Sequence, residues 1–350
     1  CTYTEFANNK YMGGTLVNIQ ADDITVKNGI IRCGHHAVYS DGYRTNIFNN
    51  EIYHIGATAI NLYGGDLTYL LPSNSVVSNN KIHDFADIER VYNGAFYAEG
   101  VGFEISHNEI YNSPHTALQN LATSLIVEYN YFHDLCYEGG DAGAIYDGTW
   151  RGNGNTFSNN IIANISNPTS HYNPNGYYCD DGGGGKTFVS NLLINIEGDA
   201  IAIGGGPANI IRDNIIVNSS LSYDQRAYYP GTGPNAGWTL TGRFGVNPSD
   251  YGLNWWWMTN GVGSYATEAW SIQFPWTMLL KTTNVVDLED NYVPYAFSNT
   301  TIRNNVNCGT GANVIQSNVL RLANIRDNPI NYLVKDVFND FENGDYTVSP

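Results

Sequence analysis

Charged side chains are scarce in this 350-residue chain, and positive ones are the scarcest. Only 14% of the residues are charged, and 16 Lys and Arg stand against 33 Asp and Glu, which gives a formal net charge of −17. Binding to a nucleic-acid backbone needs clustered Lys and Arg, and this chain lacks such clusters. The composition therefore argues against a nucleic-acid partner and favours a neutral or cationic one.

Two further absences narrow the class of protein. No stretch of 18 apolar residues occurs, so the sequence predicts no membrane-spanning helix. No CxxC pair or zinc-binding spacing occurs either among the five cysteines, Cys1, Cys33, Cys136, Cys179 and Cys308. Most of them are expected to be thiols of the core, and the alternative is one or two disulfides. The sequence predicts no metal site and no cofactor, with calcium at stacked acidic corners as the one alternative.

What the chain does contain is a recurring phrase of one or two Asn followed by an apolar pair. The Asn that precedes the apolar pair is Asn28, Asn50, Asn80, Asn108, Asn130, Asn160, Asn191 and Asn214. The steps between them are 22, 30, 28, 22, 30, 31 and 23 residues. A period of about 20 to 30 residues with one strand phrase per repeat is typical of a solenoid.

The residues of the phrase indicate which solenoid this is. The apolar positions are Ile, Val, Leu and Phe, which favour strands, and no run shows the 3.6-residue period of a helical repeat. The chain is therefore predicted to be all-β, a right-handed parallel β-helix. The shortest steps correspond to bare coils of three short strands, and longer steps add a loop at one corner. The repeated Asn suits a tight corner and can hydrogen-bond from coil to coil.

One segment breaks the repeat. Residues 1–219 and 299–350 are predicted to form coils, whereas residues 220–298 lack the Asn rhythm. Six of the seven Trp fall in this insertion: Trp238, Trp255, Trp256, Trp257, Trp270 and Trp276. A segment of this length is usually functional or a small subdomain. The Trp side chains either line a groove for sugars or form a small core on the solenoid flank, and the second interpretation is favoured.

Acidic residues recur at the end of one strand in successive coils. Alignment of HAVYSDG (36–42), GAFYAEG (94–100), GAIYDGT (143–149) and GYYCDDG (176–182) places these acids on one face: Asp41, Glu99, Asp147, Asp180 and Asp181. Strands of adjacent coils lie about 4.8 Å apart. Carboxylates one coil apart are therefore expected near the separation that glycosidases use, which predicts cleavage of a glycosidic bond.

Asp141 and the acids of the DDG motif have surroundings suited to a substrate. Asp141 lies just before the strand in EGGDAGAIYDG, between small residues that leave room for a ligand, and the DDGGGG run at 180–185 repeats this one coil later. The predicted catalytic residues are Asp141 with Asp180 or Asp181. Glu138 is expected to support Asp141 or to act in its place. The predicted substrate-binding residues are His115, Glu138, Asp147, Trp150 and Arg151.

Several longer motifs resemble a known family. EGGDAGAIYDGTWRGNGNTFSNN, YYCDDGGGG and IAIGGGPANIIRDNIIVN are similar to the secreted right-handed β-helix proteins that include glycoside hydrolase family 141, and the resemblance covers roughly residues 50–350. The resemblance implies fucosidase or xylanase activity on plant cell-wall polysaccharide, and two catalytic aspartates in the DAG and DDG motifs. The sequence departs from the family in reading DGTWRG where an Arg-Asp-Trp phrase is usual, and in having fewer N-terminal coils.

Two hypotheses about function follow. The first is a secreted hydrolase of a cell-wall or algal polysaccharide. The second is a non-catalytic, extracellular structural or adhesive β-helix that associates with its own kind through its open ends, as in a filament, because unpaired strand edges must be capped or paired. A polysaccharide lyase is disfavoured, because lyases of this fold need Lys or Arg near the acid and only Arg151 offers itself.

Overall fold

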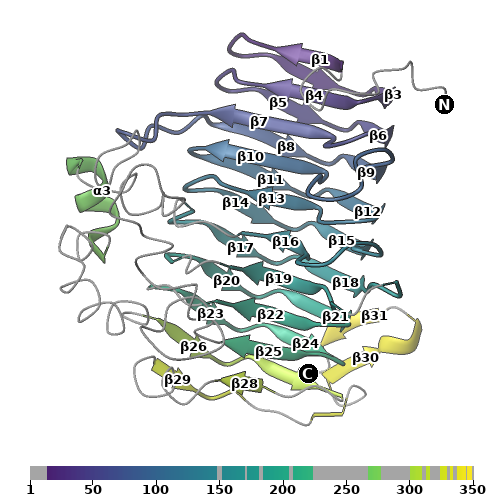
Figure 1. Cartoon of the computed structure of the whole chain (residues 1–350). Coiled ribbons are helices and arrows are strands. Elements are labelled where there is room, and N and C mark those ends of the chain that lie inside the picture. The colour runs from purple at the N-terminus through teal and green to yellow at the C-terminus, as the bar shows by residue number, and fades with distance from the viewer. Residues whose placement is uncertain are drawn as a thin grey trace, which may run out of the picture.

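Short strands stack into three long parallel sheets in the computed structural model (Figure 1). The structure describes residues 14–147, 152–169, 172–180, 184–204, 208–223, 267–276, 300–309, 313–315, 324–328, 332–333, 337–343 and 345–348. The three sheets are named A, B and C in the order in which the chain visits them. Each coil gives one strand to each sheet, and each strand pairs in parallel with the strand of the next coil.

Sheet A contains ten strands: β1 (Thr15–Ile19), β4 (His36–Ser40), β7 (Ile60–Gly64), β10 (Phe96–Gly100), β13 (Leu118–Asn120), β16 (Gly143–Tyr146), β19 (Asn175–Cys179), β22 (Asp199–Ile203), β25 (Ser220–Tyr223) and β28 (Asn313–Ile315). Sheet B contains ten: β2 (Thr25–Lys27), β5 (Asn46–Phe48), β8 (Ser75–Ser78), β11 (Phe103–Ser106), β14 (Ile126–Glu128), β17 (Thr156–Ser158), β20 (Thr187–Val189), β23 (Ile210–Arg212), β26 (Thr301–Arg303) and β29 (Asn324–Arg326). Sheet C contains nine: β3 (Ile30–Gly34), β6 (Glu51–Ile55), β9 (Lys81–Phe85), β12 (Glu109–Ser113), β15 (Tyr131–Leu135), β18 (Ile161–Ile165), β21 (Leu192–Ile196), β24 (Ile215–Val217) and β27 (Val306–Cys308).

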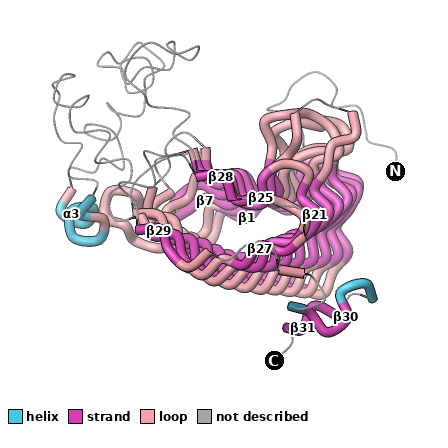
Figure 2. The backbone as a smooth tube through the Cα atoms, turned by 90° about the horizontal axis from the view of Figure 1, so that it is seen from below, coloured by secondary structure: helices cyan, strands magenta, loops and turns pink. Residues whose placement is uncertain are grey.

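Seen along the stack, the three sheets surround one continuous interior (Figure 2). Because side chains alternate between the two faces of a strand, every second residue points inward and stacks on its counterpart in the next coil. On sheet A one such inward column is Val38, Ile60, Phe96, Leu118 and Ile145, all of them fully buried. This arrangement is a parallel β-helix and confirms the predicted fold class.

The repeated Asn forms a ladder inside the corner between sheets B and C. Asn108 shows the pattern: its side-chain amide donates to Asn130 Oδ1 at 3.0 Å and to the Val77 carbonyl at 2.9 Å, and its backbone N–H donates to Asn130 Oδ1 at 2.9 Å. The ladder residues are Asn50, Asn80, Asn108, Asn130, Asn160, Asn191, Asn214, Asn305 and Asn328. The left-handed corner residue is the one before the ladder position, as at Asn49 with φ 55°. The tight corner and the coil-to-coil hydrogen bonds, which were both predicted for one Asn, therefore belong to two adjacent residues.

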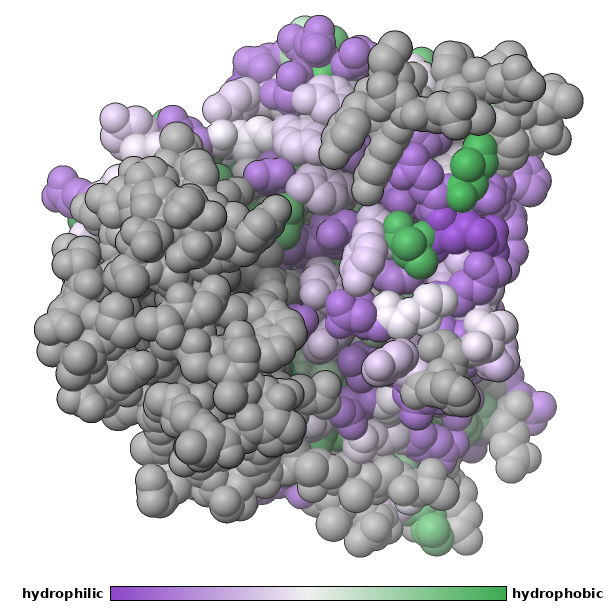
Figure 3. Space-filling model, in the orientation of Figure 1, coloured by the Kyte–Doolittle hydropathy of each residue, from purple (hydrophilic) through white to green (hydrophobic). Residues whose placement is uncertain are grey.

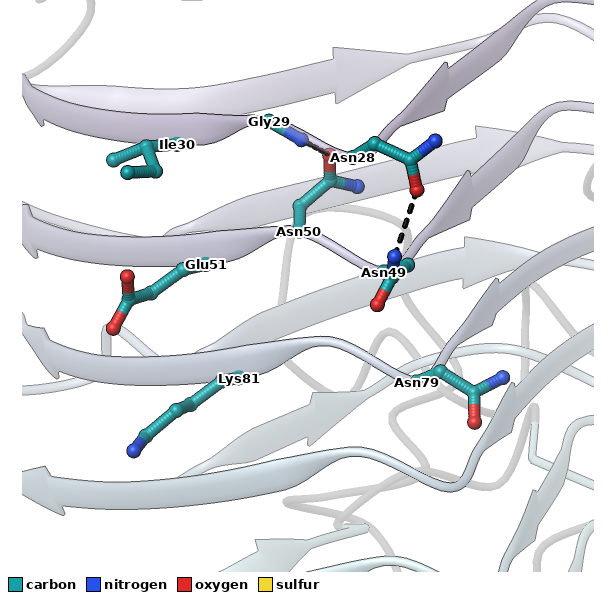
Figure 4. A pocket seen from close by; sticks show the side chains of 8 residues that line it. All are labelled: Asn28, Gly29, Ile30, Asn49, Asn50, Glu51, Asn79 and Lys81. Carbon is teal, nitrogen blue, oxygen red and sulfur yellow. Dashed lines mark hydrogen bonds between the residues drawn. The ribbon is translucent and has the colours of Figure 1, made fainter.

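The prediction that Asn28 belongs to this ladder is wrong by one residue. Gly29 occupies the ladder position and donates its backbone N–H to Asn50 Oδ1 at 3.0 Å, whereas Asn28 has φ 58° and accepts from the Asn49 amide at 2.7 Å. Figure 4 shows both contacts. Because Gly29 has no side chain, the ladder ends here, and a shallow groove of about 380 Å³ opens between Asn28, Asn49 and neighbouring residues.

The described part of the insertion packs against the flank of the β-helix. Helix α3 (Glu268–Gln273) begins after Thr267, whose hydroxyl accepts from the Trp270 backbone N–H. Trp270 is fully buried and donates its indole N–H to the Leu67 carbonyl at 2.6 Å, and Trp276 donates to Asn153 Oδ1 at 3.0 Å. Trp270 belongs to the same buried cluster as the β-helix interior, so it packs onto the solenoid flank, and the interpretation that the Trp side chains form a core of their own stays a prediction. No helix in the described part of the chain is long and apolar enough to cross a membrane.

Other parts of the predicted insertion either lie outside the described residues or belong to a coil of the β-helix. Trp238 and the Trp run at 255–257 lie outside the described residues. Strand β25 falls inside the predicted range but pairs with β22 and β28, so the coil continues to Tyr223 before the chain leaves sheet A.

A hairpin near the C-terminus covers part of sheet C from outside. Strands β30 (Phe338–Asp340) and β31 (Asp345–Val348) pair antiparallel around the 3₁₀ turn η3 (Phe341–Asn343). Val337 and Phe338 are buried in a second apolar cluster whose members on sheet C are Ala163, Ile194, Val217 and Cys308. This cluster lies on the outer face, separate from the interior of the β-helix.

Three of the described cysteines, Cys136, Cys179 and Cys308, are buried thiols outside any disulfide; Cys136 and Cys179 lie in the interior, as predicted for most of the five, and Cys308 lies in the cluster under the hairpin. Burial raises the pKa of Cys179 to about 12 and that of Cys308 to about 11, so both stay protonated. Cys33 takes part in a disulfide.

Candidate functional site

The outer face of sheet A carries a column of phenols and amides. Successive strands place these residues in register on this face: Tyr39, Asn61, Tyr97, Gln119, Tyr146 and Tyr178. A second outward column, two residues further along each strand, contains Tyr63, Glu99 and Asp180. Loops that lead from sheet C into sheet A project beyond one edge of this face (Figure 2). Figure 3 looks onto this side, where the described residues are mostly hydrophilic.

Asp141 lies at the edge of this face, just before β16. Its backbone is in the left-handed region, with φ 55°, and its side chain is exposed. The Tyr92 hydroxyl donates to Oδ2 at 3.2 Å and the Tyr178 hydroxyl donates to Oδ1 at 3.4 Å. The carboxylate is thus oriented by two phenols from different coils while remaining open to solvent.

Asp180 follows β19 at the other end of the same strand region and is half-buried. The Tyr146 hydroxyl donates to Asp180 Oδ2 at 3.2 Å, and the rings of Tyr146 and Tyr178 meet edge to face, with centroids 5.2 Å apart. Burial, and then the negative charges of Asp180 and Asp141, raise the pKa of Tyr146. Both carboxylates therefore act on one phenol, and they approach the Tyr146–Tyr178 pair from opposite ends of the strand region.

His115 lies beneath this surface. It is only 1% exposed, and both ring nitrogens are buried without a hydrogen-bond partner in the described part of the chain. Its ring packs on Tyr92 with centroids 5.1 Å apart, and a side chain at Gly139 would come within 3.1 Å of it. Burial lowers the pKa of His115. The structure places His115 as a neutral support under Tyr92, not as a group that reaches a ligand at the surface.

Glu138 is engaged elsewhere. Arg90 donates to both carboxylate oxygens of Glu138, at 2.5 and 2.6 Å, and this bidentate pair lowers the pKa of Glu138. The predicted support of Asp141 by Glu138 is not what the structure shows, because the phenols of Tyr92 and Tyr178 contact Asp141 instead. Arg90 was not singled out from the sequence, since 48 residues separate it from Glu138.

Asp147 is not on the face where the sequence alignment placed it. It follows the outward Tyr146, so it points into the β-helix, where it is fully buried and forms an ion pair with the buried Lys186. The Tyr177 hydroxyl lies 3.5 Å from Asp147 Oδ2. Burial raises the pKa of Asp147, and Lys186 partly offsets this rise. The pair links the chain after β16 to the chain before β20 beneath the site, so Asp147 has no open path to a substrate.

Three predicted site residues lie outside the described residues, namely Trp150, Arg151 and Asp181, and their roles stay predictions. Within the described ranges, no three His, Cys, Asp or Glu side chains gather as a metal-binding group. The residues that the sequence reasoning missed are Tyr92, Tyr146 and Tyr178. The signal for the last two was present, because the same aligned phrases repeat a Tyr, as in HAVY, GAFY and GAIY.

Comparison with known proteins is consistent with this architecture. A family model described as a right-handed β-helix region matches residues 15–193, just over half of the chain, and this range includes Asp141 and Asp180. The chain belongs to the right-handed β-helix family. No curated protein and no solved structure matches the chain. In this right-handed β-helix protein the coils continue beyond the matched range, through β28 and β29.

Proposed function

We propose that this right-handed β-helix protein is a secreted glycoside hydrolase that cleaves a cell-wall or algal polysaccharide with Asp141 and Asp180. The observation that supports the proposal is the pair of carboxylates from adjacent coils that accept from two touching tyrosines, Asp141 from Tyr178 and Asp180 from Tyr146. The resemblance of the DAG and DDG motifs to glycoside hydrolase family 141 supports the same assignment.

The chemistry needs two carboxyl groups on either side of a glycosidic bond. One protonates the leaving oxygen while the other acts as nucleophile or activates a water molecule. Asp141 offers an exposed carboxylate whose two oxygens are fixed by separate phenols, which supports a defined approach to the sugar. Tyr146, which stays protonated because its pKa is raised, keeps a hydroxyl donor on Asp180.

The test is the release of reducing ends from a panel of plant and algal cell-wall polysaccharides. The wild type is compared with Asp141→Asn and Asp180→Asn, and with Asp181→Asn for the neighbouring acid of the motif. Glu104→Gln is the matched control, because Glu104 is a carboxylate of sheet B that accepts from Ser106. We expect either catalytic variant to lose about 10³-fold or more in rate, since effects of this order follow removal of an acid–base or nucleophilic group.

Two outcomes would contradict the proposal. One is wild-type protein that is folded but releases no reducing ends from any polysaccharide in the panel. The other is activity that survives in Asp141→Asn or in Asp180→Asn. The anomer formed first by an active enzyme would also show whether the reaction inverts or retains configuration.

A structural or adhesive role is the second candidate, and one observation favours it. The first described coil, β1 to β3, ends all three sheets, and its inward-facing Val17, Val26 and Ile31 are only partly buried. Unpaired strand edges with apolar side chains can pair with another copy of the chain. Concentration-dependent assembly measured by analytical ultracentrifugation, abolished by Val26→Lys, would support this role, and a monomer at all concentrations would exclude it.

A further inference from the structure

The tyrosines of the candidate site continue along sheet A toward the N-terminal coils. Tyr39 and Tyr63 lie with ring centroids 5.2 Å apart, and Tyr63 and Tyr97 lie 5.7 Å apart. All are half-buried, and the Tyr97 hydroxyl donates to Glu99 at 3.0 Å. We call the outward residues Tyr39, Tyr63, Tyr97, Tyr146 and Tyr178 the tyrosine track. With the amides of Asn61 and Gln119 between them, they form a band that runs along the β-helix axis.

The orientation of the rings separates this track from the other aromatic column of the protein. On the outer face of sheet C, Tyr53, His83, Tyr111 and His133 stack with interplanar angles of only 4°, 13° and 8°, so each ring face is covered by its neighbour. The track pairs are tilted by 33° and 41°, and Tyr146 and Tyr178 meet at 88°. Tilted rings leave part of their faces uncovered, and an uncovered phenol face is suited to packing against the C–H face of a sugar.

The spacing of the coils fits a linear polymer. Adjacent strands of sheet A are about 4.8 Å apart, so the five steps from β4 to β19 cover roughly 24 Å. One sugar unit of an extended polysaccharide advances by a distance similar to one coil. A chain laid parallel to the β-helix axis would therefore meet side chains of the track in successive coils, instead of crossing them once.

The charges along the track select the kind of polymer. Glu99, Asp141 and Asp180 lie on or beside it, while Arg90, at the same edge, is paired with Glu138. A polymer that carries uronate or sulfate groups would bring negative charge against these carboxylates, and this repulsion would weaken its binding. Hydroxyl groups of a neutral sugar could instead hydrogen-bond to the carboxylates and to Asn61 and Gln119.

From these observations we propose that sheet A binds a linear, neutral polysaccharide along the tyrosine track, with about five sugar units leading into the Asp141–Asp180 site. The proposal deepens the proposed function and rests on it for the position of the cleaved bond. It adds that cleavage is internal to the polymer and that the rate and the affinity rise with chain length until the track is filled.

The test is calorimetric titration of Asp141→Asn, which prevents turnover, with oligosaccharides of two to six units. Xylo-, cello- and manno-oligosaccharides are the neutral probes, and oligogalacturonates are the charged counter-probe. Tyr63→Ala and Tyr97→Ala remove ring faces, and Tyr63→Phe keeps the face but not the hydroxyl. Tyr111→Ala on sheet C is the matched control, because it removes an equally half-buried ring whose faces are covered. Circular dichroism checks that each variant is folded.

We expect one of the neutral series to bind with an affinity that rises up to about five units. Tyr63→Ala and Tyr97→Ala should each weaken binding of the longest oligomer roughly threefold to tenfold. Tyr63→Phe should weaken it less than Tyr63→Ala does, and Tyr111→Ala should leave it unchanged. The proposal is overturned if no neutral oligomer binds, if affinity does not depend on length, if the Tyr→Ala variants bind as the wild type does, or if oligogalacturonate binds best.

The two proposals can fail separately. If binding depends on chain length and the track variants weaken it, but the wild type hydrolyses nothing, the proposed binding along the tyrosine track stands and the proposed hydrolase is refuted. If the rate of hydrolysis does not depend on chain length and Tyr63→Ala does not change it, the proposed hydrolase stands and the proposed binding along the tyrosine track is refuted.

Discussion

The outer faces of sheets A and C have the same strand spacing and similar numbers of aromatic side chains. The two faces differ in how these aromatic rings are arranged. On sheet C the rings of Tyr53, His83, Tyr111 and His133 stack face on face, and the Arg32 guanidinium lies over Tyr53. Asp84 and Asp134 contact the two imidazoles at 2.6 and 2.7 Å, so these side chains contact one another and not a ligand. On sheet A the rings are tilted, and the carboxylate of Asp141 is open to solvent.

The difference continues along the solenoid. Beyond β15 the sheet C column turns apolar, at Ala163, Ile194 and Val217, and the hairpin of β30 and β31 packs over it. On sheet C the side chains of the earlier strands therefore stack on one another, and the hairpin covers those of the later strands. Sheet A keeps polar and aromatic groups facing outward through β19. A solenoid presents several equivalent faces, and this comparison is the basis for proposing that sheet A, and not sheet C, receives the ligand.

The largest effect is expected beneath sheet A. Lys186→Met leaves the buried Asp147 carboxylate without its cation, and breaking a buried ion pair costs about 3–5 kcal/mol of the free energy of unfolding. The control is Lys81→Met on sheet C, where the cation is half exposed and 3.9 Å from Glu109, and where little change is expected. Urea unfolding measures both. Adding Asp147→Asn to Lys186→Met should recover part of the loss, and equal stability of the two Lys variants would contradict this account.

The cover of sheet C provides the next test. Phe338 is 2% exposed and contacts Phe341 and Tyr346 within the hairpin. Phe338→Ala should lower the free energy of unfolding by about 2–4 kcal/mol, because truncation of a buried aromatic ring leaves a cavity. It should leave reducing-end release unchanged, since the hairpin lies over sheet C. A loss of activity in a variant that is still folded would show that the two faces are not independent.

A third prediction compares single rings on the two faces. Tyr111 stacks on His83 and His133 and lies 5.4 Å from the Lys81 ammonium, so Tyr111→Ala should cost about 1–3 kcal/mol of stability. Tyr63→Ala should cost less, about 1 kcal/mol or below, because its ring contacts are tilted. Chemical denaturation of the two variants gives the comparison. A larger cost for Tyr63 would mean that the track is structural.

The smallest effect concerns pH. Burial holds the pKa of His115 below its usual 6.5, so the unfolded chain takes up this proton first as the pH falls. The contribution of neutral His115 to the free energy of unfolding is therefore fully present above pH 6.5. Below pH 6.5 it declines by at most about 1.4 kcal/mol per pH unit. His115→Phe removes this group, so the wild type should lose stability relative to the variant between pH 6.5 and 5. Parallel stability curves would contradict the assignment.

The fold could be predicted from the sequence because the signal repeats in every coil. The Asn ladder and the apolar columns each occur once per period, so an error in one coil does not change the architecture. The predicted position of Asn28 was off by one residue, because Gly29 has no side chain to show that it occupies the ladder position.

The site was predicted less completely, for three physical reasons. The phrase beginning at Gly176 was aligned one residue out of register, since Gly143 pairs with Asn175, and a slip of one residue exchanges the faces of a strand. Asp147 has a separate cause: it holds the fifth position of its phrase, one before that of Asp41 and Glu99, and this position points inward, as the buried Ala98 shows. The third reason is that Arg90 and Tyr92 reach the site from a loop outside the repeat, so no periodic signal announces their contacts with Glu138 and Asp141.

The measurement that tests the central claim most directly is hydroxyl-radical footprinting with mass spectrometry, which reports the solvent access of individual aromatic side chains. The protein is labelled alone and with soluble xylan, glucomannan or pectin. We predict that a neutral polysaccharide protects Tyr63, Tyr97, Tyr146 and Tyr178 and leaves Tyr53 and Tyr111 as reactive as before. Protection on sheet C instead, or no protection by any of the three polymers, would contradict the assignment of function to sheet A.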